Sequence, residues 1–459
     1  MSQAACPHGD AHLAQRVCLH LFKGEAESYS HRFTGTGIAY DLLCPACAEA
    51  SALADDETTE PPRDLLAAIC AACFEAVAAR TTWATSERAV LAAPALAERA
   101  TRLSFQHEML RVPTGLGAPL RDLVALPGSD ASRWVAVTTA GRLAVIDLTA
   151  RSSAVVADLD GAGVDPARDL EVIASPDGKL AAVVEARGPS GVVVDLETGD
   201  ITMLLDRGEP AKAARYPVAF AAAGGDRVVL VAAAAWNRLD AFDPRTGDLL
   251  VQRPSGHSQE HQLEYASSGL SASPDGAWLV DNGFTVEGAG LVSAFSLAAW
   301  LDGNPWEPDD GPSKRYLCQR WDFWDGPVTW IDPRTLAVFG YGPSRASMIP
   351  AVILFDVATG EPLRWFPGPQ GPLVHDTYPA RTVPSRDRDQ IMPDDPVGLL
   401  FSIGDDGVSV WDVAAGERLL HDAGFQPLRY HRGARQFLTT NPDADLFVVS
   451  RLVGSPDLP

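Results

Sequence analysis

The chain has 459 residues, 46 % of which are apolar, and a formal net charge of −23 at pH 7. This length predicts two or three domains, and the negative charge argues against direct binding to nucleic acid because phosphates are repelled. The longest apolar run, Val228–Trp236, is about half the length that a membrane-spanning helix needs, and no secretory signal is recognisable at the N-terminus. We therefore expect a cytoplasmic protein that binds another protein, preferably one with a basic surface, and no membrane.

Residues 1–80 hold six of the seven cysteines, and these form four pairs of potential metal ligands. Zinc takes four sulfur or nitrogen donors in a tetrahedron, and a two-residue gap lets two thiolates reach one ion. The sequence therefore predicts a small, irregular α+β domain with two structural zinc ions and no open catalytic position. The eight predicted ligands are Cys6, His8, Cys18, His20, Cys44, Cys47, Cys70 and Cys73.

Two questions about these cysteines stay open at the level of sequence. The first is whether they are reduced thiols packed as small apolar residues, since alanine-rich stretches after Cys47 and Cys73 favour helices that could bury them. The second is which ligands share an ion. A cross-braced pairing would join the first pair to the third and the second to the fourth, as in RING-type modules. A redox role is disfavoured because no thioredoxin-like βαβ context is visible.

The four pairs resemble a small bacterial zinc-binding module with the pattern CPxHG, VCxHL, CxxC and CxxC. The matching segments here are Cys6–Gly9, Val17–Leu21, Cys44–Cys47 and Cys70–Cys73, with one residue fewer inside the first pair. The resemblance implies a zinc-binding fold and transfers no function.

Residues 81–100 are rich in alanine and helix formers and are interrupted by Pro94. We expect them to form a short helical connector between the two domains.

Residues 101–459 show an all-β pattern of short strands separated by Gly, Pro, Asp and Asn turns. One unit recurs, in which a strand ends in Asp and the following turn closes on Gly or Ala. These residues suit a turn because the Asp side chain can cap its backbone N–H groups and Gly supplies a positive φ. A second marker is the turn Ser-Pro-Asp-Gly, at 175–178 and 273–276. The recurring positions are Asp147, Asp195, Asp243, Asp356 and Asp412, with Ser296 in a degenerate copy.

Four short antiparallel strands in roughly 40 to 50 residues correspond to one blade of a β-propeller. We predict seven four-stranded blades, with counts of six or eight left open. The seventh blade has only three strands of its own, and Leu103–Arg111 is predicted to supply the fourth, which closes the ring and removes sheet edges. The blades are placed near 117–160, 167–207, 214–254, 263–320, 327–367, 371–422 and 425–453.

This pattern resembles the WD-repeat and related bacterial propellers over roughly three quarters of the chain. The resemblance rests on the Ser-Pro-Asp-Gly turns and on strands ending in Trp-Asp or Phe-Asp before a Thr-Gly turn. Only Trp411-Asp412 reproduces the signature dipeptide, and the Gly-His dipeptide is missing. Such propellers are mostly protein-interaction platforms, so the resemblance implies that role.

Two features of the propeller region suggest chemistry or binding. The segment His257–His261 matches HxxEH, a zinc-protease signature that requires a helix, and we predict a solvated loop instead because it lies between blades. Six aromatic residues crowd one stretch and form either a binding patch or, as we expect, packing between blades four and five. They are Trp300, Trp306, Trp321, Phe323, Trp324 and Trp330, flanked by insertions at 302–312 and 384–396.

The sequence thus favours a non-enzymatic interaction scaffold with a structural zinc domain. Two alternatives stay open, namely a propeller enzyme of the hydrolase or lactonase type and a sensor that binds a small ligand in the central channel. The enzyme would need several Asp, Glu, Asn or His side chains from different blades converging on one point.

Overall fold

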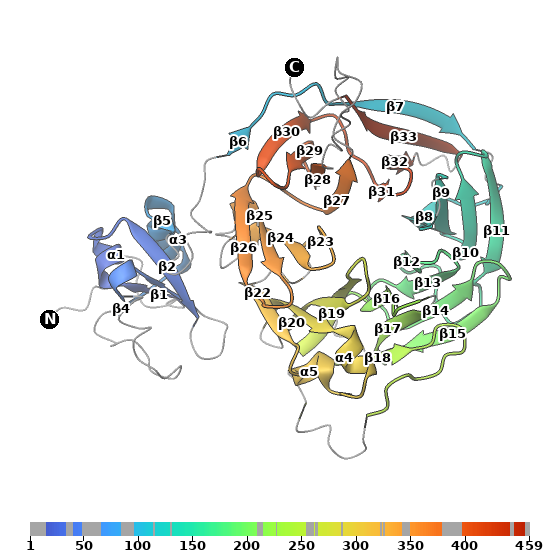
Figure 1. Ribbon diagram of the computed structural model, residues 1–459, viewed down its shortest axis with the longest axis horizontal. Coiled ribbons are helices and arrows are strands. Elements are labelled where there is room, and N and C mark those ends of the chain that lie inside the picture. Colours follow the sequence, from blue (N-terminus) through green and yellow to red (C-terminus); the bar gives the residue numbers. More distant parts are fainter. Residues whose placement is uncertain are drawn as a thin grey trace, which may run out of the picture.

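The computed structural model comprises a β-sheet ring and a small N-terminal domain, here called the head (Figure 1). The described residues are 15–33, 40–47, 66–83, 96–112, 115–128, 131–208, 214–225, 227–253, 261, 265–285, 288–321, 324, 326–341, 349–378, 397–440 and 445–454.

The head is an α+β domain built on one mixed sheet. Its strands are β1 (Gln15–Cys18), β2 (Ser28–Phe33), β3 (Tyr40–Leu43), β4 (Leu66–Ile69) and β5 (Thr82–Trp83), in the order β4-β1-β3-β2-β5. The helices are α1 (Leu19–Lys23) and α3 (Ala71–Arg80). Val17, Leu21, Leu42, Ile69 and Phe74 form a core with almost no exposed surface. The domain that the sequence presents as irregular therefore has a regular five-stranded sheet.

The predicted helical connector at 81–100 is not helical at its described positions. The chain is extended at β5 and again at β6 (Ala97–Glu98), and residues 84–95 lie outside the described residues. Strand β6 pairs in parallel with an outer strand of the ring, so the edge of a sheet determines its conformation rather than the helix propensity of alanine.

The ring consists of seven sheets whose own strands pair antiparallel, with β6 added in parallel to one of them, which confirms the predicted seven-bladed propeller. In blades 1 to 5 the first strand along the chain lies nearest the axis and the last lies at the rim, whereas β6 and β7 are the outermost strands of the sheets of blades 6 and 7 (Figure 1). Blade 1 has β8 (Leu120–Ala125), β9 (Arg133–Thr138), β10 (Arg142–Asp147) and β11 (Ser152–Asp158); blade 2 has β12 (Leu170–Ala174), β13 (Leu180–Glu185), β14 (Ser190–Asp195) and β15 (Ile201–Asp206). Blade 4 has β19 (Tyr265–Ala272), β20 (Trp278–Thr285), β21 (Ala289–Ser296) and β22 (Arg315–Trp321); blade 5 has β23 (Val328–Trp330), β24 (Thr335–Tyr341), β25 (Ile349–Asp356) and β26 (Pro362–Pro367). Blade 6 has β27 (Leu373–Tyr378), β28 (Val397–Gly404), β29 (Gly407–Asp412) and β30 (Glu417–Asp422).

The described residues of blade 3 form three strands, where four were predicted. It has β16 (Val218–Ala222), β17 (Val228–Ala235) and β18 (Arg238–Phe242), and Phe242 forms only an isolated bridge with Leu249. The guanidinium group of Arg253 donates a hydrogen bond to the carbonyl of Leu239, at 3.1 Å, on the strand that would otherwise pair with a fourth. A side chain thus satisfies an edge carbonyl that a backbone N–H satisfies in the other blades.

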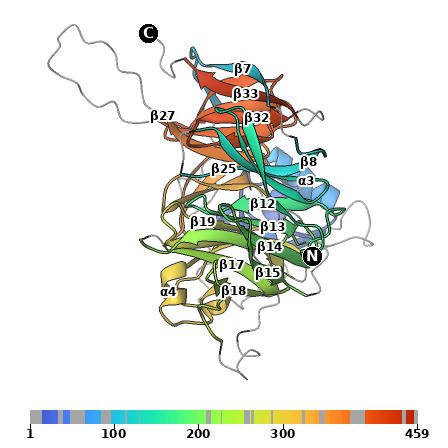
Figure 2. The same ribbon diagram turned by 90° about the vertical axis from the view of Figure 1, so that its right-hand side faces the viewer.

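Blade 7 contains β31 (Arg429–His431), β32 (Gln436–Thr440) and β33 (Leu446–Val453), and its rim strand is β7 (Ser104–Arg111). Strand β7 pairs antiparallel with β33 over eight residues, from Ser104 opposite Val453 to Arg111 opposite Leu446 (Figure 2). This confirms the predicted closure of the ring by Leu103–Arg111. Phe105 of β7 packs on Phe425 and Phe437, so apolar contacts reinforce the ladder.

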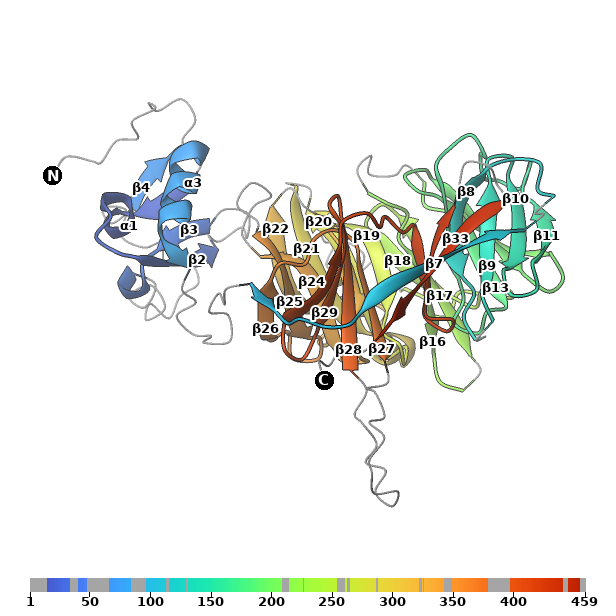
Figure 3. The same ribbon diagram turned by 90° about the horizontal axis from the view of Figure 1, so that it is seen from above.

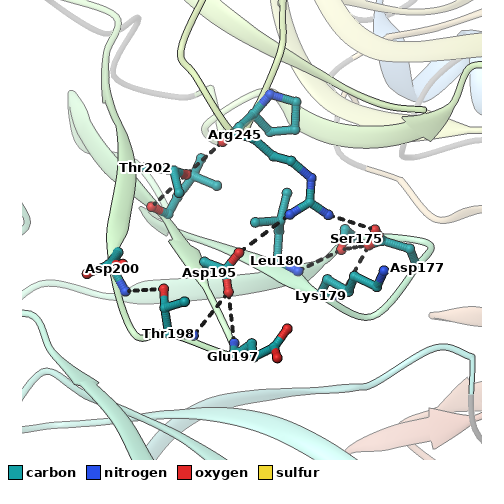
Figure 4. A network of polar contacts seen from close by, with 12 residues as sticks. Ser175, Asp177, Lys179, Leu180, Asp195, Glu197, Thr198, Asp200, Thr202 and Arg245 are labelled. Carbon is teal, nitrogen blue, oxygen red and sulfur yellow. Dashed lines mark hydrogen bonds and ion pairs between the residues drawn. The ribbon is translucent and has the colours of Figure 1, made fainter. Parts of the chain in front are cut away.

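The recurring Asp residues cap the turns as expected. Asp195 Oδ1 accepts hydrogen bonds from the N–H groups of Glu197 and Thr198, and its Oδ2 lies 3.4 Å from the guanidinium of Arg245 in blade 3 (Figure 4). Arg245 also contacts Asp177 of the Ser-Pro-Asp-Gly turn at 3.1 Å. The turn markers therefore also hold neighbouring blades together. Turn N–H groups are capped in the same way by Asp147, Asp243, Asp356 and Asp412.

The excursion between β21 and β22 contains two short helices, α4 (Leu297–Leu301) and α5 (Glu307–Asp310). Ser296, at the degenerate copy of the repeat, caps α4 by accepting a hydrogen bond from the N–H of Ala299. Across the part of the chain that the structure describes, no helix is both long enough and apolar enough to cross a lipid bilayer.

Candidate metal centre

The three described ligand pairs of the head share one local structure, because each lies where a strand passes into a helix. Cys18 ends β1 and precedes α1, which carries His20. Cys44 follows β3, and Cys47 lies in the helical turn after it. Cys70 follows β4 at the start of α3, and Cys73 lies in the first turn of that helix. The short gap within each pair thus reflects a tight strand-to-helix turn.

The sheet brings the second and third pairs together. Strand β1 pairs in parallel with β3, so the carboxyl ends of the two strands, with Cys18 and Cys44, meet at one edge. The Nδ1 atom of His20 lies 3.6 Å from the Sγ of Cys44 and 3.3 Å from the Sγ of Cys47. The backbone N–H of Cys44 donates to the Sγ of Cys18 at 3.2 Å. All four potential ligand atoms lie within 4.8 Å of one another.

The spacing of these atoms fits one tetrahedral metal ion. Ligands at about 2.3 Å from zinc are about 3.8 Å apart in a tetrahedron. Cys18, Cys44 and Cys47 are buried, with 0 %, 4 % and 8 % of their surface exposed. Burial raises the pKa of the Cys18 thiol and raises the pKa of Cys47 to about 12. Thiolates are therefore costly here without a cation, and the cluster could bind a metal ion that compensates for their charge.

The structure tests only part of the predicted ligand set. It brings Cys18 and His20 together with Cys44 and Cys47, a grouping that differs from the cross-braced arrangement, in which the second pair joins the fourth. Cys70 and Cys73 are described but do not belong to this group, and Cys6 and His8 lie outside the described residues. Strand pairing decides which of these pairs meet, and for this reason the sequence alone leaves the sharing of ligands open.

The HxxEH segment is described only at its last residue. His261 stacks on Trp306, with ring centroids 4.4 Å apart, and its Nδ1 lies 2.9 Å from the carboxylate of Asp310. His257 and Glu260 lie outside the described residues.

The crowded aromatic residues are mainly packing residues. Trp300, Trp306 and Trp330 are 1 %, 9 % and 5 % exposed. Trp330 packs between blades 4 and 5 as expected, whereas Trp300 packs with Leu239 of blade 3, so the predicted packing between blades four and five holds only in part. Trp324 lies against Phe284, and the side chains of Trp321 and Phe323 lie outside the described residues.

Charged side chains of innermost strands pair with residues of neighbouring blades. Asp122 of blade 1 contacts Arg429 of blade 7 at 2.6 Å, and Glu171 of blade 2 contacts Arg215 of blade 3 at 3.0 Å. Burial raises the pKa of Glu171. Sequence reasoning missed these pairs because their partners lie far apart along the chain. Within the described ranges, the head cluster is the one group of three or more His, Cys, Asp or Glu side chains placed to hold a metal ion.

Solved structures resemble this chain in fold at low sequence identity. One is from the crystal structure of the Mitotic Checkpoint Complex, with a TM-score of 0.45 and 14 % identity, covering 78 % of this chain and 96 % of that one. Another is BamB from Moraxella catarrhalis, with a TM-score of 0.42 and 15 % identity, covering 76 % of this chain and 99 % of that one. No family model matches the chain, and no curated protein matches it.

Proposed function

We propose that the protein is a non-enzymatic interaction scaffold of the cytoplasm, in which a zinc-stabilised head accompanies a propeller that binds another protein. The observation that supports the metal is the cluster of Cys18, His20, Cys44 and Cys47. Its three sulfur atoms and one imidazole nitrogen lie within 4.8 Å of one another, close to the spacing of four ligands around one tetrahedral ion. Apolar packing of reduced cysteines would not need a histidine nitrogen facing two of the sulfur atoms.

The head binds two zinc ions in this proposal. Cys70 and Cys73 repeat the strand-to-helix arrangement of the first site but lie outside it, so they need two more ligands. Cys6 and His8 are the remaining predicted pair, and we assign them to this second ion. Both sites have four protein ligands and are closed, which makes the metal structural.

Metal analysis of the purified chain tests this assignment. We expect two zinc ions per chain, one ion in the Cys70→Ser/Cys73→Ser variant, and two in Cys318→Ser, which removes a cysteine of the ring. A zinc-free wild-type chain with a folded head would rule out the metal, and one ion in the wild type would rule out the second site.

The scaffold role is supported by large apolar side chains exposed at the rim of three consecutive blades. Met109 of β7 is 74 % exposed, Val155 of β11 50 % and Leu204 of β15 67 %. We take these exposed apolar side chains as the contact points of a partner protein, and the charge of −23 favours a basic surface on that partner.

Affinity purification from the native host tests the role. A partner retained by the wild type should be lost from Met109→Asp/Leu204→Asp and kept by Gln106→Asp, which changes an exposed polar residue of the same rim. Equal retention by all three proteins would show that this rim is not the binding surface.

A further inference from the structure

Residues 96–101, here called the strap, run along the outer edge of blade 6 before the chain continues into β7 (Figure 3). Ala97 and Glu98 pair in parallel with Glu417 and Arg418 of β30. The backbone N–H of Arg99 donates to the carbonyl of Arg418 at 2.9 Å, and the hydroxyl of Thr101 donates to the carbonyl of Leu419 at 2.8 Å. The strap therefore acts as a fifth strand of the blade.

The side chain of Arg99 occupies an anionic slot beside this edge. Its Nη2 lies 2.7 Å from Asp412 Oδ2, and its Nε lies 3.4 Å from Glu417 Oε2. The other oxygen of Asp412 accepts the N–H of Ala415, so the turn of the repeat fixes the orientation of the carboxylate. The Asp412 side chain is only 11 % exposed, which strengthens its interaction with one bound guanidinium.

An apolar notch lies at the other end of the strap. A Cβ atom built on Gly368 would lie 2.2 Å from Cη2 of Trp411 and 2.9 Å from Cδ1 of Leu96. The absence of a side chain at Gly368 therefore leaves room for the leucine next to the indole ring. Trp411 is buried, and its N–H donates to the hydroxyl of Ser402, so the ring is held in place.

The strap is attached much less extensively than the strand that follows it. Its ladder covers two residues, whereas β7 pairs with β33 over eight. Leu96 remains 45 % exposed, and the ion pair between Glu98 and Arg418 is at the surface. Release of the strap from blade 6 would leave the eight-residue ladder of β7 with β33, and with it the closure of the ring, in place.

We propose that the outer edge of blade 6 is a docking site for an extended segment of a separate polypeptide, with a leucine followed three residues later by an arginine. The strap fills this site in cis with Leu96 and Arg99. The proposal rests on the scaffold function above and names one of its contact sites. The segment adds a strand to the edge of β30, the arginine enters the slot of Asp412 and Glu417, and the leucine enters the notch at Gly368.

Occupancy in cis regulates the site. A tethered segment has a high effective concentration at its own site, so a free segment of equal affinity is excluded from the wild-type protein. A variant with a weakened strap should bind the free segment, and this is the measurable consequence of the proposal.

The experiment measures the binding of a fluorescent peptide of residues 95–102 to the full chain by anisotropy. Arg99→Ala should bind it at least about tenfold more tightly than the wild type does. Adding Asp412→Asn and Glu417→Gln to Arg99→Ala should weaken binding by at least about tenfold. Asparagine keeps the oxygen that caps the turn, so this change removes charge and not the fold.

Two controls make the outcome decisive. Arg102→Ala, an exposed arginine just beyond the strap, should behave as the wild type does, and a peptide carrying Arg99→Ala should not bind. An unchanged main melting transition in every variant shows that the ring is intact. Equal affinity of Arg99→Ala and the wild type for the peptide, or equal affinity for both peptides, would overturn the docking site. The scaffold function would survive that result if the intact protein still retained its partner.

Discussion

Gly276 shows how a single residue of the repeat brings two blades together. It closes a Ser-Pro-Asp-Gly turn of blade 4 with a φ of +72°, and a Cβ built there would lie 1.7 Å from the carbonyl oxygen of Ala222 in blade 3. Gly178 has the equivalent place in blade 2, with 2.5 Å between its built Cβ and the carbonyl oxygen of Pro127. Glycine is therefore required both by the turn and by the close approach of the preceding blade.

We predict that Gly276→Ala destabilises the ring by at least about 3 kcal/mol, from backbone strain plus overpacking. Gly224→Ala is a matched control, because Gly224 has a φ of +79° and nothing within 4 Å of a built Cβ. It should cost only about 1 kcal/mol. Denaturant unfolding of the two variants measures the difference. Equal losses of stability in the two variants would mean that the contact between blades 3 and 4 relaxes around the added methyl group.

The head and the ring are separate at the scale of elements, since the cluster ligands lie in β1, α1 and the chain after β3, and none lies in the propeller. We predict that chelation, or Cys44→Ser with Cys47→Ser, unfolds the head and makes residues 15–83 sensitive to protease. The reason is that metal binding supplies folding free energy to a domain with a small core.

The ring should keep its melting transition in the same samples, and Cys318→Ser should leave the head resistant. A loss of both domains together would show that the head is part of the ring's cooperative unit. A resistant head without metal would instead show that its core of Val17, Leu42 and Phe74 is sufficient.

Strand β7 closes the ring by pairing with β33. We predict that deletion of residues 101–112 lowers or abolishes the melting transition of the propeller while the head keeps its metal and its protease resistance. The deletion removes an eight-residue ladder and the packing of Phe105, and it exposes the edge of β33. Calorimetry together with zinc analysis measures both outcomes. An unchanged transition would mean that the hydrogen bonds and packing between blades close the ring without the strand.

The sequence was sufficient for elements whose signal is local. The Asp residues and the Ser-Pro-Asp-Gly turns set the blade repeat because turn chemistry depends on adjacent residues, as the capping of Asp195 shows. The distant pairing of β7 with β33 was predicted because the seventh blade lacks a strand of its own, whereas other features that depend on distant partners were missed or left open. Arg253 binds the carbonyl of Leu239 in blade 3, β6 pairs with β30, and the Cys18 and Cys44 knuckles meet through strand pairing. None of these contacts produces a repeating pattern in the sequence from which it could be predicted.

The whole ring contains buried histidines whose protonation opposes folding. Burial, with the nearby guanidinium of Arg432, lowers the pKa of His375 to about 4, and burial also lowers the pKa of His431. Both lie on innermost strands, and the Nε2 atom of His375 has no hydrogen-bond partner among the described residues. Folding therefore favours the neutral imidazole.

We predict that the stability of the ring is full above pH 6.5 and falls as the pH drops towards 4, because the unfolded chain then binds protons that the folded chain excludes. His375 alone contributes a loss on the order of 3 kcal/mol over this window. Urea unfolding between pH 7 and pH 4 measures the slope. His375→Gln should make the slope shallower, and an unchanged slope would assign the acid sensitivity to other groups.

The pairing of β7 with β33 also has a consequence for protein synthesis. About 335 residues separate Arg111 from its partner Leu446, and a ribosome that adds roughly 5 to 20 residues per second needs roughly 20 to 70 seconds to make them. Throughout that time β7 has no strand to pair with. A nascent propeller therefore carries an unpaired strand until its seventh blade is made, and a ribosome stalled within blades 2 to 6 would leave a product prone to aggregation.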